Sequence, residues 1–282
     1  MRIFFELFLY FITFSILGWI MEVFLKYLQF HRFINRGFLI GPYCPIYGYG
    51  VLFITIIIEG LLKLDNNIIL SFLCGMILCG AIEYITSWFM EKMFHARWWD
   101  YSQKPLNING RVWIGNLLLF GLAAVLIIYL VNPFYFKLIK NINNTILYTI
   151  GIILLIIYIS DNIISYFVMN IVKNEIDNTT QDNTESIAKE VRMLLSNKNL
   201  LIKRINNAYP NFKARPKRIL LEIKKAKEQY KIKIKEFKKL KKQYIKKQEQ
   251  KLINEINIAK ANVEKAHNKY IEIKEKLFSK IK

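Results

Sequence analysis

Residues 68–90 read IILSFLCGMILCGAIEYITSWFM, an apolar stretch that contains one charged side chain, Glu83. A hydrocarbon core about 30 Å thick is crossed by roughly 20 apolar residues in a helix, so this stretch is long enough to span a bilayer. Four more segments meet the same requirement: 3–25, 44–62, 112–131 and 146–169. The sequence therefore predicts an all-α fold, a polytopic membrane bundle of about five transmembrane helices, followed by a long basic C-terminal helix or coiled coil.

Hydrophobicity and charge are separated along the chain. Of its 282 residues 54% are hydrophobic, yet the formal net charge is +20. Residues 171–282 hold 30 Lys and Arg and 13 Asp and Glu, an excess of 17 positive charges, so the remainder is nearly neutral. One ordinary soluble domain does not combine these properties. We predict a transmembrane domain (1–170), a polar linker with an amphipathic helix (171–216) and a basic cytoplasmic coiled-coil-like helix (217–282).

The loops between the predicted helices differ in positive charge. Cytoplasmic loops carry an excess of Lys and Arg. Five crossings with the tail inside place seven Lys and Arg in the inside loops and four in the outside segments. The pattern predicts a multi-pass protein of the cell membrane with its N-terminus outside and its C-terminal tail in the cytoplasm.

The loop after the first predicted helix is rich in Gly, Pro and aromatic residues. It reads NRGFLIGPYCPIYGYG over 35–50, where Gly and Pro work against a regular helix. Irregular backbone at membrane depth is tolerated only where protein or a water-filled cavity surrounds it. Two interpretations fit: a re-entrant entry to the second crossing, or a tight loop with aromatic anchors at the membrane interface.

The loop after the third predicted helix joins paired tryptophans to charged residues. It reads EKMFHARWWDYS over 91–102. Adjacent Trp residues at a membrane boundary are typical interface anchors, which is how we interpret Trp98 and Trp99. Arg97 and Asp100 flank them, and can pair with each other or bind a charged head group.

Three acidic side chains, Glu22, Glu83 and Asp161, lie within predicted helices near the same face of the membrane. A charge near the bilayer centre costs roughly 2.5–3.5 kcal/mol even on insertion scales, so such groups usually face the bundle interior and find partners. We expect these partners to be arginines of the inside loops. The candidate substrate-binding residues are Glu22, Arg36, Glu83, Arg97, Asp100, Arg111, Asn116 and Asp161.

The same residues also have a purely structural interpretation. Intramembrane ion pairs and hydrogen bonds can simply hold helices together, and Glu22 and Glu91 lie near enough to the interface to reach outward. Glu6 and Glu59, at the opposite ends of their helices, are expected to be interfacial. Gly18, one turn before Glu22, is expected to allow close helix packing.

Two kinds of chemical signal are missing from the sequence. No phosphate-binding loop of the form Gly-x-x-x-x-Gly-Lys-Ser/Thr occurs, so any ATP hydrolysis needs a separate subunit. Cys44, Cys74 and Cys79 show no zinc-site spacing with the histidines. We expect no metal and no cofactor, and no residue is assigned as catalytic.

The tail contains no Gly or Pro from Lys217 onward, which predicts one helix on the order of 100 Å long. Its apolar residues recur in steps of three and four, as in the apolar seam of a coiled coil: Ile223, Ala226, Tyr230, Phe237, Leu240 and Tyr244, then Leu252, Ile256, Ala259, Val263, Ala266, Tyr270, Ile273 and Leu277.

The tail is also strongly basic: between Lys224 and Lys251 there are 13 Lys and only 3 Glu. We expect anionic inner-leaflet lipids or a homo- or hetero-oligomeric partner. Nucleic acid is not expected, because no recognised binding module is present, and a merely solvated coiled coil is the alternative.

Several ordered motifs carry a resemblance to a known family. They are Gly18-Trp19 with Glu22, the run from Asn35 to Gly48, Glu83-Tyr84-x-Thr86-Ser87, Met90-Glu91, and the run from Arg97 to Ser102 followed by Asn109-Gly110-Arg111. Over roughly residues 5–130, and less clearly to 170, the chain resembles the bacterial integral-membrane proteins of the putative ABC-transporter type IV permease family. The resemblance implies a permease subunit of the bacterial inner membrane that works with a separate ATPase. It implies no particular substrate.

Three functions are open at this point. The favoured one is a permease-like subunit with a cytoplasm-facing polar cavity, in which Glu22 and Glu83 contact a cation or proton. The second is a membrane-embedded enzyme or binding protein for phospholipid head groups, in which the loop arginines hold phosphate and Glu83 or Asp100 acts as base. The third is a membrane scaffold organised by its coiled coil.

Overall fold

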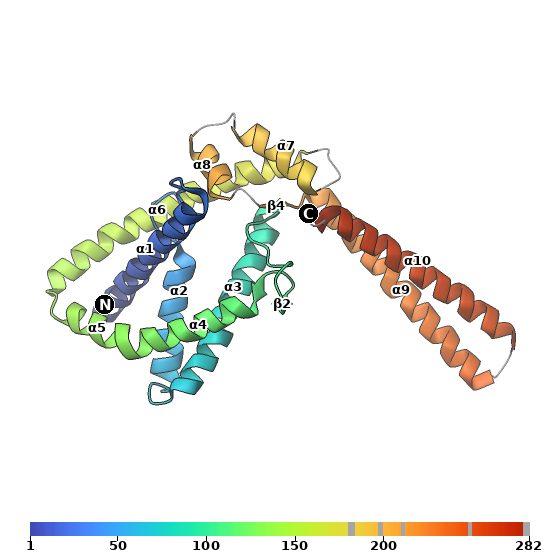
Figure 1. The fold of residues 1–282 in the computed structure, drawn as a ribbon, viewed down its shortest axis with the longest axis horizontal. Helices are drawn as coiled ribbons and strands as arrows, with labels where there is room; N and C mark the ends of the chain where they lie inside the picture. The colour runs from blue at the N-terminus through green and yellow to red at the C-terminus, as the bar shows by residue number, and fades with distance from the viewer. Residues whose placement is uncertain (180–183, 197–199, 210–211, 248–249, 279–282) are drawn as a thin grey trace. The chain divides into compact units, whose positions relative to one another are not determined.

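A computed structural model describes residues 1–179, 184–196, 200–209, 212–247 and 250–278 (Figure 1). The chain divides into two compact units. The first, which we call the membrane unit, comprises Met1–Val172 and Leu195–Phe212, and the second, the tail unit, comprises Lys173–Leu194 and Lys213–Lys282. The predicted transmembrane domain lies wholly within the membrane unit.

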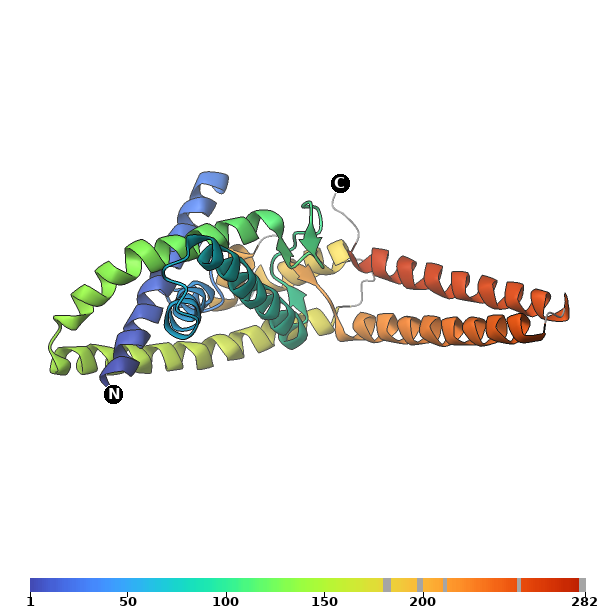
Figure 2. The ribbon, with the colours of Figure 1, turned by 90° about the horizontal axis from the view of Figure 1, so that it is seen from below.

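Five consecutive helical segments form the membrane unit (Figures 1 and 2). They are α1 (Arg2–Phe30), α2 (Pro45–Phe53) continued by the π-helix η1 (Ile54–Leu61), α3 (Ile68–Phe94), α4 (Ile114–Leu126) continued by the π-helix η2 (Ile127–Val131) and α5 (Asn132–Lys140), and α6 (Asn144–Asp177). Among the described residues, four of these segments are long and apolar enough to cross a membrane: α1, α3, the stretch from α4 to α5, and α6. The all-α multi-pass bundle is thus confirmed.

The segment predicted over 44–62 forms a shorter helix than expected. It runs from Pro45 to Leu61, which corresponds to about 25 Å at 1.5 Å per residue, against a hydrocarbon core of about 30 Å. Pro45 stands in the first turn, where its missing N–H breaks no helical hydrogen bond. The five predicted crossings are therefore four long helices and one short one.

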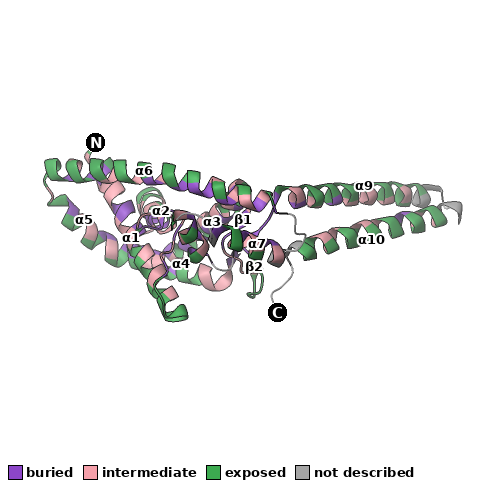
Figure 3. Ribbon diagram, turned by 90° about the horizontal axis from the view of Figure 1, so that it is seen from above, coloured by how far each residue is buried: buried purple, intermediate pink, exposed green. Residues whose placement is uncertain are grey.

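The helices of the membrane unit bury one narrow face each and expose apolar side chains elsewhere. On α6 the buried positions share one face at helical spacing: Leu147, Gly151, Asp161, Ser165, Val168, Met169, Val172 and Ile176. Large apolar side chains occupy exposed positions between them: Ile152, Ile156, Ile163 and Phe167. Figure 3 shows this pattern as a broken buried stripe along a mostly exposed α6. An apolar exposed face is what a helix in contact with lipid requires.

The packing of α1 on α2 depends on Gly18. A Cβ atom at this position would overlap the ring of Tyr47, so a larger residue would displace α2. Small residues permit this close approach of membrane helices. The expectation that Gly18 allows close packing beside Glu22 is confirmed.

Two loops lie at the same end of the membrane unit, which we call the loop end: the first loop (31–44) and the second loop (95–113). Phe38 of the first loop contacts Phe94, the last residue of α3, with ring centroids 5.4 Å apart. The second loop holds β1 (Ala96–Arg97) and a hairpin in which β2 (Asn107–Ile108) pairs antiparallel with β3 (Val112–Trp113). Asn109 and Gly110 form its turn at φ 53° and 67°, as a type I′ turn requires.

The first loop contains no regular helix and runs back along α1. The Trp19 Nε1 donates to Asn35 Oδ1 at 2.8 Å, and the backbone N–H of Cys44 donates to the Ser15 carbonyl at 2.8 Å. Ser15 lies fifteen residues before the end of α1, a distance of about 22 Å along a helix. The loop thus enters the bundle, which favours the re-entrant interpretation over a tight surface loop.

The linker region forms two amphipathic helices, α7 (Thr184–Ser196) and α8 (Leu200–Ala208), and a short strand, β4 (Lys213–Ala214). One amphipathic helix was expected within 171–216, and residues 197–199, between the two observed helices, lie outside the described part of the chain. Five apolar residues of the two helices are buried, Ile187, Val191, Leu195, Ile202 and Ile205, whereas Leu194 is exposed.

The tail forms two helices that pack side by side, α9 (Lys217–Lys247) and α10 (Gln250–Phe278) (Figures 1 and 2). The ring centroids of Tyr230 and His267 are 5.1 Å apart, whereas 37 residues of one continuous helix would separate them by about 55 Å. The prediction of a single helix of about 100 Å is therefore wrong. The tail instead packs α9 against α10 within one chain. Three of the residues in the predicted apolar pattern of the tail, Tyr244, Leu252 and Leu277, lie outside the residues whose side chains are described.

Candidate functional site

The structure gathers the predicted site residues into four groups at the loop end of the membrane unit. These are Glu22 with Arg36, Glu83 with Asn116, Arg97 with Asp100 and Arg111, and Asp161 with the first loop. The groups differ in how many of their carboxylate oxygens have a hydrogen-bond or ion-pair partner within the protein.

Glu22, in the C-terminal part of α1, pairs with Arg36 of the first loop. The Arg36 Nε lies 3.4 Å from Glu22 Oε2, and the Tyr47 hydroxyl donates to Glu22 Oε1 at 2.7 Å. Arg36 also donates to the Ala208 carbonyl and stands 4.7 Å from the centre of the Tyr209 ring. The expectation that an arginine of an inside loop pairs with an intramembrane acid is confirmed for Glu22, whereas the residues at the end of α8 that cover Arg36 had no signal in the sequence.

Glu83 is buried in α3, with 7% of its surface exposed. Its Oε1 accepts hydrogen bonds from Asn116 Nδ2 of α4 at 3.0 Å and from the Tyr101 hydroxyl at 3.2 Å. Asn116 is itself oriented by the Trp113 Nε1, which donates to its Oδ1 at 2.9 Å. The other carboxylate oxygen, Oε2, is buried and has no hydrogen-bond partner among the described residues. A buried polar atom of this kind is rare and costly in a folded protein.

The charges of Glu22 and Glu83 both raise the pKa of the Tyr101 hydroxyl. The pKa of Tyr101 in the second loop is raised mainly by burial and then by the charge of Glu83, and Glu22 adds to the shift. Tyr101 is therefore a neutral donor at physiological pH. Glu22, Tyr47, Glu83, Tyr101 and Asn116 are referred to below as the carboxylate site.

Arg97 and Arg111 of the second loop pair with Glu91 and not with Glu83. The Glu91 Oε2 lies 3.0 Å from Arg97 Nε and 2.8 Å from an Arg111 terminal nitrogen. Glu91 is buried, so of the two alternatives for this residue the structure favours a paired acid inside the protein over a side chain that reaches outward to the interface. The two arginines do find an acid of α3, but it is the one nearest the second loop.

Asp100 completes a neutral network of four charges with Glu91 and the two arginines. Its Oδ1 lies 3.2 Å from an Arg97 terminal nitrogen. Gly110, at φ 67°, closes the network, because a Cβ atom there would overlap Asp100 Oδ1. With two positive and two negative groups already paired, this network braces the second loop and has little charge left for a ligand.

Trp98 does not anchor the protein at the membrane interface. Its side chain is buried and packs against Tyr209 and Phe212, with ring centroids 4.9 Å and 5.7 Å away. The anchor interpretation is therefore wrong for Trp98. Trp99 is partly buried, and its Nε1 donates to the Arg111 carbonyl at 3.1 Å.

Asp161 of α6 holds the first loop in place. Its carboxylate accepts from the backbone N–H groups of Ile40 at 2.9 Å and Gly41 at 2.7 Å. The hydroxyl groups of Tyr43 and Ser165 also donate to it. Four donors satisfy the two carboxylate oxygens, so Asp161 has less capacity for a ligand than Glu83 has.

A polar cluster that the sequence did not indicate lies in the half of the bundle away from the loop end. The Thr55 Oγ1 is bonded to the Tyr10 hydroxyl at 3.1 Å and to Asn132 Nδ2 at 3.0 Å. Asn132 is buried and also donates to Glu59, contrary to the expectation that Glu59 is merely interfacial. Thr55 and Glu59 belong to η1, and π-helical turns are frequent at functional sites.

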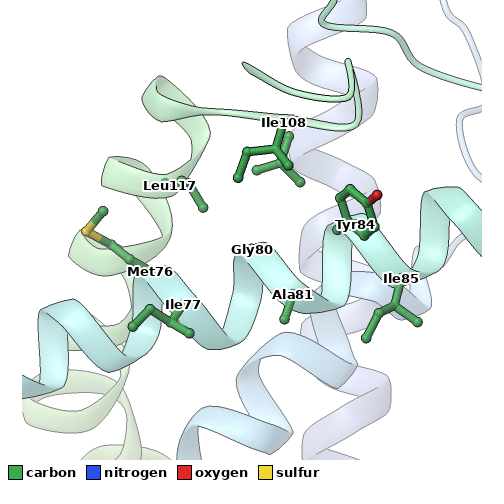
Figure 4. A pocket seen from close by; sticks show the side chains of 9 residues that line it. Met76, Ile77, Gly80, Ala81, Tyr84, Ile85, Ile108 and Leu117 are labelled. Carbon is green, nitrogen blue, oxygen red and sulfur yellow. The ribbon is translucent and has the colours of Figure 1, made fainter. Parts of the chain in front are cut away.

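Two cavities of the membrane unit are large enough to hold a small ligand. One, of about 450 Å³, lies on α3 beside α4 and the hairpin, and its described lining residues are all uncharged. Figure 4 shows Met76, Tyr84, Ile108 and Leu117 around it. The other, of about 400 Å³, lies at the loop end between the first loop, α3 and α6. Across the ranges that the structure describes, no group of three or more His, Cys, Asp or Glu side chains is arranged to hold a metal ion.

Comparison with known proteins identifies the family of the chain. No curated protein and no solved structure matches it. A family model described as "Putative ABC-transporter type IV" matches residues 9–166, which is more than half of the 282 residues and includes every candidate site residue. The chain therefore belongs to this family of membrane transport-related proteins.

Proposed function

We propose that the chain is the membrane-embedded subunit of a transport system, in which a separate chain hydrolyses ATP and the carboxylate site receives a cation or proton from the cytoplasm. Family membership and the multi-pass apolar bundle support a role in membrane transport. One observation carries the site: Glu83 is buried, and its Oε2 has no partner among the described residues.

Glu83 is the group that changes its charge state in this proposal. Asn116 and Tyr101 both donate to Oε1, which fixes the carboxylate and leaves Oε2 for the cation or proton. Glu22 supplies a second negative charge nearby, partly neutralised by Arg36. Neutralising a buried carboxylate removes most of the cost of its burial, so the site favours the bound state.

The proposed orientation places the loop end in the cytoplasm. The excess of Lys and Arg in the loops at this end and in the tail supports that orientation. A cytoplasmic loop end and tail are accessible to an ATPase subunit. The exposed lysines of α9 can in addition lie on the anionic inner leaflet.

The geometry gives less support to the head-group alternative in its original form. Its phosphate ligands were Arg36, Arg97 and Arg111. Arg97 and Arg111 are neutralised by Glu91 and Asp100, and Arg36 is paired with Glu22 at 3.4 Å. The scaffold alternative draws its support from the tail alone, and α9 packs against α10 within one chain.

Co-purification tests the proposal directly. The tagged full-length chain is extracted from its native membrane in a mild detergent, and every co-purifying protein is identified by mass spectrometry. We expect an ATPase in stoichiometric amount, whose activity depends on the membrane subunit. The Glu83→Gln variant should retain the ATPase but lose that dependence. A chain that purifies without an ATPase would overturn this part of the proposal.

A further inference from the structure

The loop-end cavity of about 400 Å³ has the size of a ligand site, since such sites span roughly 300–1,000 Å³. Its wall is built from the first loop, α3 and α6, and much of it is aromatic or sulfur-containing: Phe38, Phe89, Met90, Met93, Phe94 and Tyr166. The described residues that line it are all uncharged. Flexible Met and flat aromatic side chains adapt to an apolar chain of variable shape.

The cavity adjoins the lipid-facing surface of the bundle. Phe89 of α3 is 52% exposed and Tyr166 of α6 is 44% exposed, and both line the cavity. Exposed side chains on apolar spanning helices contact lipid tails. An apolar chain can therefore enter from the bilayer without crossing water.

Two arginines stand behind the wall of this cavity. Tyr209 lines it, and Arg36 lies 4.7 Å from the centre of the Tyr209 ring. Arg204 of α8 donates through Nη2 to the carbonyls of Gly37, at 3.3 Å, and Leu39, which also line the cavity. The Nε and Nη1 atoms of Arg204 are buried and have no hydrogen-bond partner among the described residues.

The acids in this region are already occupied by other groups. Glu22 is paired with Arg36 at 3.4 Å, and Asp161, whose charge also acts on Arg204, accepts from four donors. Arg204 bonds only neutral oxygens among the described residues, those of Asn35, Gly37 and Leu39. A guanidinium with unused donors and no direct ion pair suits a phosphate group.

The ring of Tyr209 shows how close both arginines come to the cavity wall. Burial raises the pKa of Tyr209 to about 12, while the charges of Arg36 and Arg204 act to lower it and that of Glu22 acts to raise it. Tyr209 is therefore a neutral donor at physiological pH. Tyr209 thus lies in the cavity wall with Arg36 against its ring.

We propose that this cavity binds an anionic phospholipid of the surrounding leaflet, with one acyl chain against Phe89, Met93 and Tyr166 and the head-group phosphate at Arg204 and Arg36. The apolar lining, the membrane-facing position and a guanidinium with unused donors directly behind the wall at Gly37 and Leu39 together match an anionic amphiphile. The site uses neither Glu83 nor Asn116, so it does not depend on the proposed transport function.

Native mass spectrometry of the full-length protein tests this site. The protein is reconstituted in vesicles that contain equal parts of phosphatidylglycerol and phosphatidylcholine, extracted, and washed with detergent. We expect the wild type to retain one phosphatidylglycerol, and Arg204→Gln to retain about tenfold less, because a charge-assisted contact is lost. Lys203→Gln is the matched control, since Lys203 is the exposed neighbour on α8.

A second variant tests the acyl-chain part of the site. Met93→Trp fills the cavity and keeps both arginines, and it should also lose the retained lipid. Thermal unfolding of each variant shows whether it remains folded. Equal retention of phosphatidylglycerol by the wild type and by both folded variants would overturn the proposal, and so would equal retention of phosphatidylcholine and phosphatidylglycerol by the wild type.

Discussion

At the scale of the residue, Glu83 is the most informative side chain. Glu83→Gln keeps the shape of the side chain and removes its charge, so we expect the thermal stability to stay the same or to rise, because a buried charge is costly. The wild type should be stabilised by added monovalent cation or by acid, since a ligand that binds the folded state raises its stability. The variant should lose this response.

Thermal unfolding in detergent over a series of cation concentrations and pH values measures both effects. Glu6→Gln is the control, because Glu6 forms a partly exposed pair with Arg2 at 2.7 Å in the other half of the bundle. An equal response of the wild type and Glu83→Gln would argue against a cation or proton at this carboxylate.

Glu91 allows a separate prediction about the arginine network. Glu91→Gln leaves Arg97 and Arg111 buried with one fewer negative charge, so we expect a loss of about 3–5 kcal/mol in the free energy of unfolding. Glu6→Gln should cost about 0–1 kcal/mol, as expected for an exposed pair. Chemical denaturation of both variants makes the comparison, and equal small losses would show that the network does not brace the second loop.

The sequence predicted part of this residue-scale picture. Glu22 and Arg36 could be matched because an acid near a helix end and an arginine early in the next loop are close along the chain. The partners of Glu83 could not, because Tyr101 and Asn116 come from a loop and a helix whose positions depend on the Asn109-Gly110 turn. Glu91 was judged by its distance from the helix end, which does not show that the second loop folds over it.

At the scale of the element, the first loop depends on α6. Asp161→Ala removes the acceptor of the Ile40 and Gly41 amide hydrogens, so we expect these amides to exchange with solvent at least about tenfold faster, as the loss of about 1.4 kcal/mol or more implies. Hydrogen–deuterium exchange followed by mass spectrometry measures the peptide that contains them. Ser160→Ala, at an exposed position on the same helix, should leave the exchange unchanged.

The helices themselves were predictable because apolar length is a strong signal. The residues at which the helices begin and end were harder to predict. The fourth segment was predicted to end at residue 131, but the helix continues into α5 (Asn132–Lys140), since Asn132 is satisfied by Thr55 and Glu59 of a neighbouring helix. From their residue types alone, Asn132 and Pro133 are predicted to start a loop.

At the scale of the whole molecule, α9 and α10 of the tail pair with each other within one chain. Tyr230→Cys with His267→Cys, in a chain whose own three cysteines are replaced by alanine, should be joined within one chain by a short thiol crosslinker, because the two rings are 5.1 Å apart. Gel mobility distinguishes this product from a crosslinked dimer. A predominant dimer would show that the seam is closed between chains.

The periodicity of the tail predicted which residues form its seam, but not what the seam faces. Ala226 and Ala259 are buried in the structure, as the pattern of threes and fours requires. The same pattern is compatible with one long helix paired with a partner chain and with two helices of one chain paired with each other. Only contacts such as that between Tyr230 and His267 separate the two cases.

The irregular first loop has a consequence for the order in which the protein is made. Its backbone amides at residues 40 and 41 are satisfied by Asp161, which leaves the ribosome about 120 residues later. Unpaired backbone groups are not stable among lipid tails. The loop can therefore reach its final depth only after α6 has been synthesised, so the first and last helices of the bundle must assemble together rather than in the order of translation.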